Sequence, residues 1–74
     1  MTLNNGKIGA TYTINSLQLD REIMGRLEAL GLTGGTDIKI LNRNREGSVI
    51  LMVRGSRLAL GKAISQSIDM KEVE

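Results

Sequence analysis

Alternation of apolar and polar residues along the chain predicts a protein built mainly from short β-strands. Five segments alternate or are apolar throughout: residues 11–17, 37–42, 48–53, 56–60 and 67–73. In the first segment Tyr12 and Ile14 share one face, with Ser16 as the third position of that face. In the second, Ile38 and Ile40 share one face. We expect these faces to line the core. The inward residues expected from the last segment are Ile68, Met70 and Val73.

The segment between the first two predicted strands has a helical period instead. Ile23, Met24, Leu27 and Leu30 recur at spacings of three and four, which predicts a helix over residues 21–30.

Both ends of this helix are marked by capping residues. Asp20 is a good N-cap because its carboxylate can accept from the free N–H groups of the first turn. Gly31 can supply the left-handed residue that ends a helix, and Leu32 then lies where it can touch Leu27. The helix boundaries are therefore predicted from local chemistry alone.

The remaining connections are short. The polar segment 42–47 closes a hairpin, Arg54 and Gly55 form a tight turn, and residues 61–67 form one short helical turn. The strand 48–53 is apolar on both faces. Either it is a central strand covered on both sides, or one face is left open for a partner.

Five short strands and one helix in 74 residues can bury a core only if the sheet curls onto itself. We therefore expect a mainly β fold with one inserted helix: a small, SH3-like, partly open β-barrel of about five strands, forming a single domain over residues 1–74. A ferredoxin-like sandwich with two helices is the alternative. It is disfavoured because the segment 62–67 is too short for the second helix.

Composition narrows the classes of function. The chain has no histidine and no cysteine, so the commonest acid/base at neutral pH and the usual nitrogen and sulfur metal ligands are missing. Tyr12 is the one aromatic residue, which leaves no platform for stacking nucleic-acid bases, and a net charge of +2 does not favour a polyanion. We expect no enzyme activity, no cofactor and no nucleic-acid partner.

Two ligand hypotheses fail on the residues themselves. The segment Arg54 to Ala63, RGSRLALGKA, looks like a phosphate-binding loop, but five residues separate Gly55 from Gly61 and no hydroxyl follows Lys62. The carboxylates of Asp20, Glu22 and Glu28 could be read as an iron site, but without histidine or cysteine such a site would be weak. We predict neither site. No apolar run approaches the length needed to span a bilayer, and no signal peptide is evident, so we expect a cytoplasmic protein without direct membrane insertion.

Three stretches together resemble the FeoA family: RLEALGL at 26–32, the turn residues Gly35 and Thr36, and VRGSRLALGKA at 53–63. One departure is Gly34, where members often carry proline. The resemblance covers nearly the whole chain. It implies an SH3-like domain that binds the cytoplasmic GTP-binding region of the ferrous iron transporter FeoB and supports iron uptake, with weak self-association left open.

Two other functions stay open. Similar domains form the C-terminal part of iron- and manganese-dependent repressors, so a regulatory protein-interaction domain is one alternative, although the chain leaves no room for a winged helix after Met1. A small RNA-binding barrel is the other. The lack of aromatic residues argues against it.

We expect the partner to contact one of two surfaces. The first is the C-terminal end of the helix, where Leu30 or Leu32 could protrude beside Arg26; alternatively both leucines belong to the core. The second is the sheet face that carries Leu41 and one side of the strand 48–53; alternatively the helix covers that face.

Four arginines could assist the partner contact. Arg54 and Arg57 flank the Gly55 turn, while Arg43 and Arg45 lie in the hairpin loop. Such contacts would mainly raise the association rate and would be salt-sensitive. The alternative role for these arginines is a solvated rim.

Overall fold

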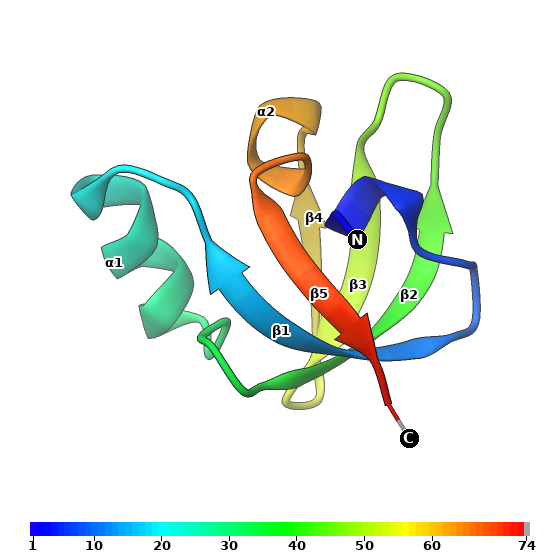
Figure 1. Cartoon of the computed structure of the whole chain (residues 1–74), viewed down its shortest axis with the longest axis horizontal. Coiled ribbons are helices and arrows are strands. Elements are labelled where there is room, and N and C mark those ends of the chain that lie inside the picture. Colours follow the sequence, from blue (N-terminus) through cyan, green and yellow to red (C-terminus); the bar gives the residue numbers. More distant parts are fainter. Residues whose placement is uncertain (74) are drawn as a thin grey trace.

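The computed structural model describes residues 1–73, and five antiparallel strands curl around one core in it (Figure 1). The elements, in chain order, are a 3-10 turn η1 (Leu3–Asn5), β1 (Thr11–Leu17), α1 (Arg21–Ala29), β2 (Asp37–Arg43), β3 (Val49–Val53), β4 (Ser56–Leu60), α2 (Lys62–Ser65) and β5 (Ile68–Glu72). The order across the sheet is β4-β3-β2-β1-β5. The predicted partly open five-stranded barrel is confirmed, and the ferredoxin-like alternative is excluded because α2 is a single turn.

Burial alternates along the strands as the sequence pattern predicts. In β3, Val49, Leu51 and Val53 are buried, whereas Ile50 is 40% exposed. The outer face of β3 is therefore open, as the second interpretation of this apolar strand had it. The buried apolar side chains of the whole barrel form one cluster: Leu3, Tyr12, Ile14, Leu27, Leu32, Ile38, Ile40, Val49, Leu51, Val53, Leu60, Ile68 and Met70.

Two irregularities in pairing bend the sheet into a barrel. The register between β1 and β5 shifts between Ile14 and Ser16, and that between β2 and β3 shifts between Ile40 and Asn42. A bulge adds local twist and bends the strand that carries it. Leu41 lies at the second bulge and is half-buried.

The N-terminal segment closes one end of the barrel, which the sequence pattern did not predict. Leu3 in η1 is fully buried, and the Met70 amide donates to the Met1 carbonyl at 2.7 Å. The segment lies close against the core at Gly6, where an added Cβ would fall 2.9 Å from side-chain atoms of Ile40 and Met70. The absence of a side chain at this glycine therefore allows the chain to pass over the core.

Three predictions near the ends of these elements need correction, and Arg43, predicted in the hairpin loop, is the last residue of β2. Val73 is 46% exposed and does not point inward, because β5 makes its last pairing at Glu72, opposite Tyr12. Ser16 is only half-buried, since the bulge in β1 interrupts the alternation just before it. The regular part of α1 ends at Ala29, one residue earlier than predicted.

Candidate functional site

The capping predicted for α1 is present at both ends of the helix. The Asp20 carboxylate accepts from the Ile23 amide at 3.0 Å. At the other end Gly31 has a φ of +90°, and the Leu32 amide donates to the Leu27 carbonyl at 2.9 Å. This is the hydrogen bond of a Schellman motif, which turns the chain back toward the helix.

This turn separates the two candidate leucines. Leu30 is 51% exposed, whereas Leu32 is fully buried in the core. Leu32 is therefore a core residue. Of the two leucines, only Leu30 is accessible to a partner in the folded domain. Leu30 is held firmly because its own amide bonds to carbonyls of the last helical turn.

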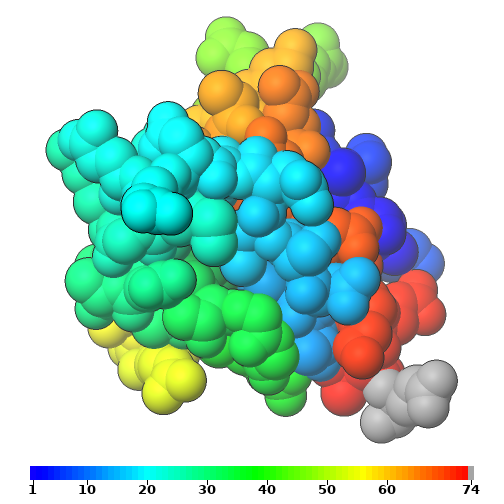
Figure 2. Space-filling view, turned by 60° about the vertical axis from the view of Figure 1, so that its left-hand side comes forward, coloured from blue at the N-terminus to red at the C-terminus, as the bar shows by residue number. Residues whose placement is uncertain are grey.

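Arg54 lies over the end of α1 from a distant part of the chain. Its Nε donates to the Gly31 carbonyl at 3.3 Å, and a Cβ at Gly31 would fall 2.6 Å from the Arg54 Cδ. Figure 2 shows the turn between β3 and β4 (yellow) beside the segment that follows α1 (green). A cation at a helix C-terminus is favourable because the free carbonyls there carry partial negative charge. We call Arg26, Leu30, Gly31 and Arg54 the helix corner.

Arg54 also has an unusual backbone conformation. Its φ is +49°, which is uncommon for a residue other than glycine. Together with Gly55, at +82°, it makes the two-residue turn between the paired residues Val53 and Ser56. Sequence reasoning predicted the turn but missed the contact with Gly31, because no local pattern links residues 23 positions apart.

Arg26 keeps its charge available to a partner. Its Nη2 lies 3.7 Å from Oε1 of Glu22 one turn earlier, and the two side chains are 76% and 82% exposed. Exposed ion pairs of this spacing contribute only about 0.3–0.5 kcal/mol. The pair can therefore open at little cost.

Leu41 and Arg57 lie away from the helix corner, on the sheet. Arg57 is paired with Met52 across β3 and β4, and Ile50 and Ala59 form the next pair on the same face. We call Ile50, Met52, Arg57 and Ala59 the outer sheet face. Leu41 lies at the β2 bulge with only part of its side chain accessible. The structure thus divides the six candidates: three at the corner, Leu32 in the core, and two on the sheet.

Comparison with known proteins fits this architecture. The family model of the FeoA domain matches residues 1–72. The chain belongs to the FeoA family. A protein of Methanocaldococcus jannaschii with the provisional name Fe(2+) transport protein A is 28% identical over 68 residues, which are 92% of this chain and 82% of that protein.

Solved structures support the fold of this FeoA-family chain. The solution structure of the FeoA protein from Chlorobium tepidum superposes with a TM-score of 0.90 at 23% identity, covering 100% of this chain and 71% of that one. A manganese-dependent transcriptional repressor gives a TM-score of 0.87 at 17% identity, covering 99% of this chain but 41% of the repressor. The fold is SH3-like, as predicted.

Within residues 1–73, no three histidine, cysteine or acidic residues cluster where they could hold a metal ion. In the same part of this FeoA-family chain, no helix has the length and apolar character needed to cross a bilayer. The hydrogen bond from the Asn15 amide and the N-terminal ammonium group lower the pKa of Asp69. This carboxylate joins the N-terminal segment to β5 and β1.

Proposed function

We propose that this FeoA-family protein is a cytoplasmic, non-enzymatic accessory module of ferrous iron uptake. In this proposal the helix corner docks on the cytoplasmic GTP-binding region of the FeoB transporter. Membership of the family supports the link to Fe(2+) transport. The observation that carries the docking surface is Leu30: a large apolar side chain, half exposed, held by a Schellman turn between two arginines.

The physical case rests on preorganisation. An exposed apolar anchor on a rigid turn loses little side-chain and backbone freedom when it is buried by a partner. The guanidinium groups of Arg26 and Arg54 carry charge beside it, and such rim charges guide an acidic surface to the anchor. The corner therefore combines the apolar centre and polar rim of a protein interface.

The outer sheet face is the second candidate for the same partner, because Ile50 is 40% exposed there. It lacks the fixed turn and has Arg57 as its flanking cation. The helix corner is the better candidate, since its anchor is more exposed and is flanked on both sides.

The test is a titration of the isotope-labelled protein with the soluble GTP-binding region of FeoB, followed by NMR, with GDP and with a non-hydrolysable GTP analogue. Leu30→Ser is compared with Ile50→Thr, a matched loss of exposed apolar surface on the other face. We expect shifts around residues 26–32 and 54–55, and a weaker complex for Leu30→Ser only. A complex weakened only by Ile50→Thr would move the docking surface to the sheet, and no binding with either nucleotide would refute the proposed partner.

A further inference from the structure

A second surface lies at the other end of the barrel from the helix corner, where η1, the loop between β2 and β3, and α2 come together (Figure 1). An open pocket of about 470 Å³ is formed there. Its lining includes two arginines, one lysine, one acidic residue, an asparagine amide and an exposed apolar side chain: Arg43, Arg45, Lys62, Glu46, Asn4 and Ile8.

The walls of this pocket are held in place by internal hydrogen bonds. The Asn44 side-chain oxygen accepts from the amides of Glu46 and Ser48, both at 3.0 Å. The Ser65 hydroxyl donates to the Gly47 carbonyl at 2.6 Å, and Ser65 is fully buried. The loop is therefore tied both to itself and to α2, so a ligand meets a formed surface.

The pocket lining holds three basic side chains and one acidic side chain, Glu46. Arg43, Arg45 and Lys62 are exposed and make no ion pair with any acid in residues 1–73. Arg43 Nη1 donates to the Asn4 carbonyl at 3.3 Å, which positions the guanidinium group over the pocket. The Asn4 side-chain oxygen accepts from the Thr2 hydroxyl at 2.6 Å, so the amide nitrogen of Asn4 remains as a further donor. Such a surface favours ligands with carboxylate oxygens.

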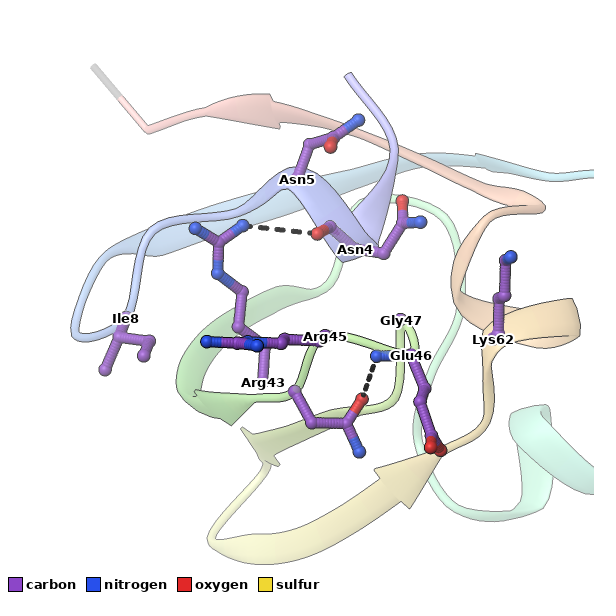
Figure 3. Close-up of a pocket in the computed structure, with 9 residues that line it drawn as sticks. Asn4, Asn5, Ile8, Arg43, Arg45, Glu46, Gly47 and Lys62 are labelled. Atoms are coloured by element: carbon purple, nitrogen blue, oxygen red, sulfur yellow. Dashed lines mark hydrogen bonds between the residues drawn. The ribbon is translucent and has the colours of Figure 1, made fainter.

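The cations are spread along the pocket rather than gathered at one point. Figure 3 shows the guanidinium groups of Arg43 and Arg45 on the same side, near Ile8, with the Lys62 ammonium at the other end. The Glu46 carboxylate points away from the Lys62 ammonium. Ile8 is 58% exposed, although it is a large apolar residue. An extended chain can reach both groups of cations, whereas a compact anion would meet one of them. The hollow also suits a chain better than a flat lipid surface.

We propose that this pocket binds an extended acidic segment of a partner protein. Carboxylates of the segment pair with the two arginines and with Lys62, and an aliphatic side chain of the segment packs on Ile8. The proposal goes beyond the helix corner, since the two surfaces share no residue.

The test uses a fluorescein-labelled synthetic peptide in which glutamates alternate with leucines, and a second peptide with glutamine in place of each glutamate. Binding is followed by fluorescence anisotropy. We expect the acidic peptide alone to bind, with an affinity that falls as salt is raised. The triple variant Arg43→Gln, Arg45→Gln, Lys62→Gln should bind roughly tenfold more weakly or worse, since three exposed pairs are lost.

The matched control is the triple variant Arg21→Gln, Lys39→Gln, Lys71→Gln, which removes the same charge from exposed positions outside the pocket. It should change the affinity by less than about twofold, because distant exposed charges are screened. Glutamine at position 62 keeps the carbons that cover Gly47, so the loop should stay folded. If the pocket triple variant unfolds, Arg45→Gln alone should still weaken binding about twofold to fivefold.

Three results would overturn the proposal. Equal weakening by both triple variants would show that only net charge matters. Equal binding of the glutamine peptide would show that carboxylates are not recognised. Binding to vesicles of phosphatidylserine and phosphatidylcholine that depends on the pocket arginines, without binding of the acidic peptide, would assign the surface to lipid.

Discussion

The two ends of the barrel share one local arrangement but are held by different hydrogen bonds. At each end a glycine with left-handed backbone lies under the stem of a basic side chain from another element. Gly31, with φ +90°, lies under Arg54, and Gly47, with φ +94°, lies under Lys62. A Cβ would fall 2.6 Å from the Arg54 Cδ at the first glycine and 2.9 Å from the Lys62 Cγ at the second.

The difference lies in what holds each glycine carbonyl. The Gly31 carbonyl accepts from the exposed Arg54 guanidinium at 3.3 Å, whereas the Gly47 carbonyl accepts from the buried Ser65 hydroxyl at 2.6 Å. At the pocket, therefore, the hydrogen bond that holds the loop is internal, and the Lys62 ammonium pairs with no acid in residues 1–73. At the helix corner the Arg54 guanidinium itself makes the hydrogen bond that holds the turn. A partner that binds Arg54 must therefore compete with the Gly31 carbonyl.

The largest expected effect concerns the two leucines of the helix corner. Leu32→Asp should lower the free energy of unfolding by at least about 3–5 kcal/mol, because a carboxylate would replace a fully buried apolar side chain. Leu30→Asp should change it by about 0.5 kcal/mol or less, since the side chain is half exposed. Chemical denaturation of both variants measures the difference. Similar losses for both would mean that Leu30 is a core residue and would remove the anchor of the corner.

A smaller loss is expected at the turn that carries Arg54. Gly55 has a φ of +82°, and nothing lies within 4 Å of the place where its Cβ would be. Gly55→Val should therefore lower stability by about 2 kcal/mol through backbone strain alone. Gly34→Val is the control, because Gly34 is not left-handed and its Cβ would meet only the Asn15 carbonyl at 3.7 Å. An unchanged thermal midpoint for Gly55→Val would contradict this explanation of the turn.

Sequence reasoning succeeded where structure depends on near neighbours. The strands, the Asp20 cap, the Gly31 turn and the tight turn at Gly55 follow from residues a few positions apart. The helical period alone places Leu30 with Leu27, but the Schellman turn brings Leu32 onto the core and leaves Leu30 outside.

Features that join distant segments could not be predicted in this way. Leu3 fills the end of the barrel, and Ser65 reaches the hairpin loop 18 residues earlier, yet neither position stands out in any periodic pattern. Arg54 could be assigned to a turn but not to the end of α1. Sequence reasoning thus named the residues that form the helix corner. It did not predict their exposure or their contacts, because these depend on tertiary packing.

The hydrogen bond to the Gly47 carbonyl should contribute more to the free energy of unfolding than the hydrogen bond to the Gly31 carbonyl. Ser65→Ala should cost about 1–2 kcal/mol, because it leaves the Gly47 carbonyl without its buried donor. Arg54→Gln should cost less than about 0.5 kcal/mol, since the bond to Gly31 is long and exposed. Denaturation midpoints of both variants give the comparison. Equal losses of stability in Arg54→Gln and Ser65→Ala would contradict the view that the helix corner is held by the weaker hydrogen bond.

The smallest expected effect is a difference between the two ends in how their local stability depends on pH. The pKa of Asp69 is lowered from its ordinary value of 3.8, first by the Asn15 side-chain amide and then by the N-terminal ammonium. A lowered folded-state pKa means that this carboxylate stabilises the fold above pH 3.8 and that the contribution is lost as the pH falls through the lowered value. Because one of the two partners of this carboxylate is the N-terminal ammonium, at 3.2 Å, we expect protonation of Asp69 to weaken the attachment of the N-terminal segment, and with it the pocket wall, before it affects the helix corner.

Hydrogen exchange at two amides tests this directly. The Met70 amide, bonded to the Met1 carbonyl at 2.7 Å, reports on the N-terminal segment, and the Leu32 amide, bonded to the Leu27 carbonyl at 2.9 Å, reports on the corner. Between about pH 6 and about pH 2.5 we expect protection to fall at Met70 more than at Leu32, relative to exchange in an unfolded peptide at each pH. Asp69→Asn should remove that difference, because the amide does not titrate. If the difference persists in Asp69→Asn, another carboxylate controls the pocket wall and the two ends are not separated by this residue.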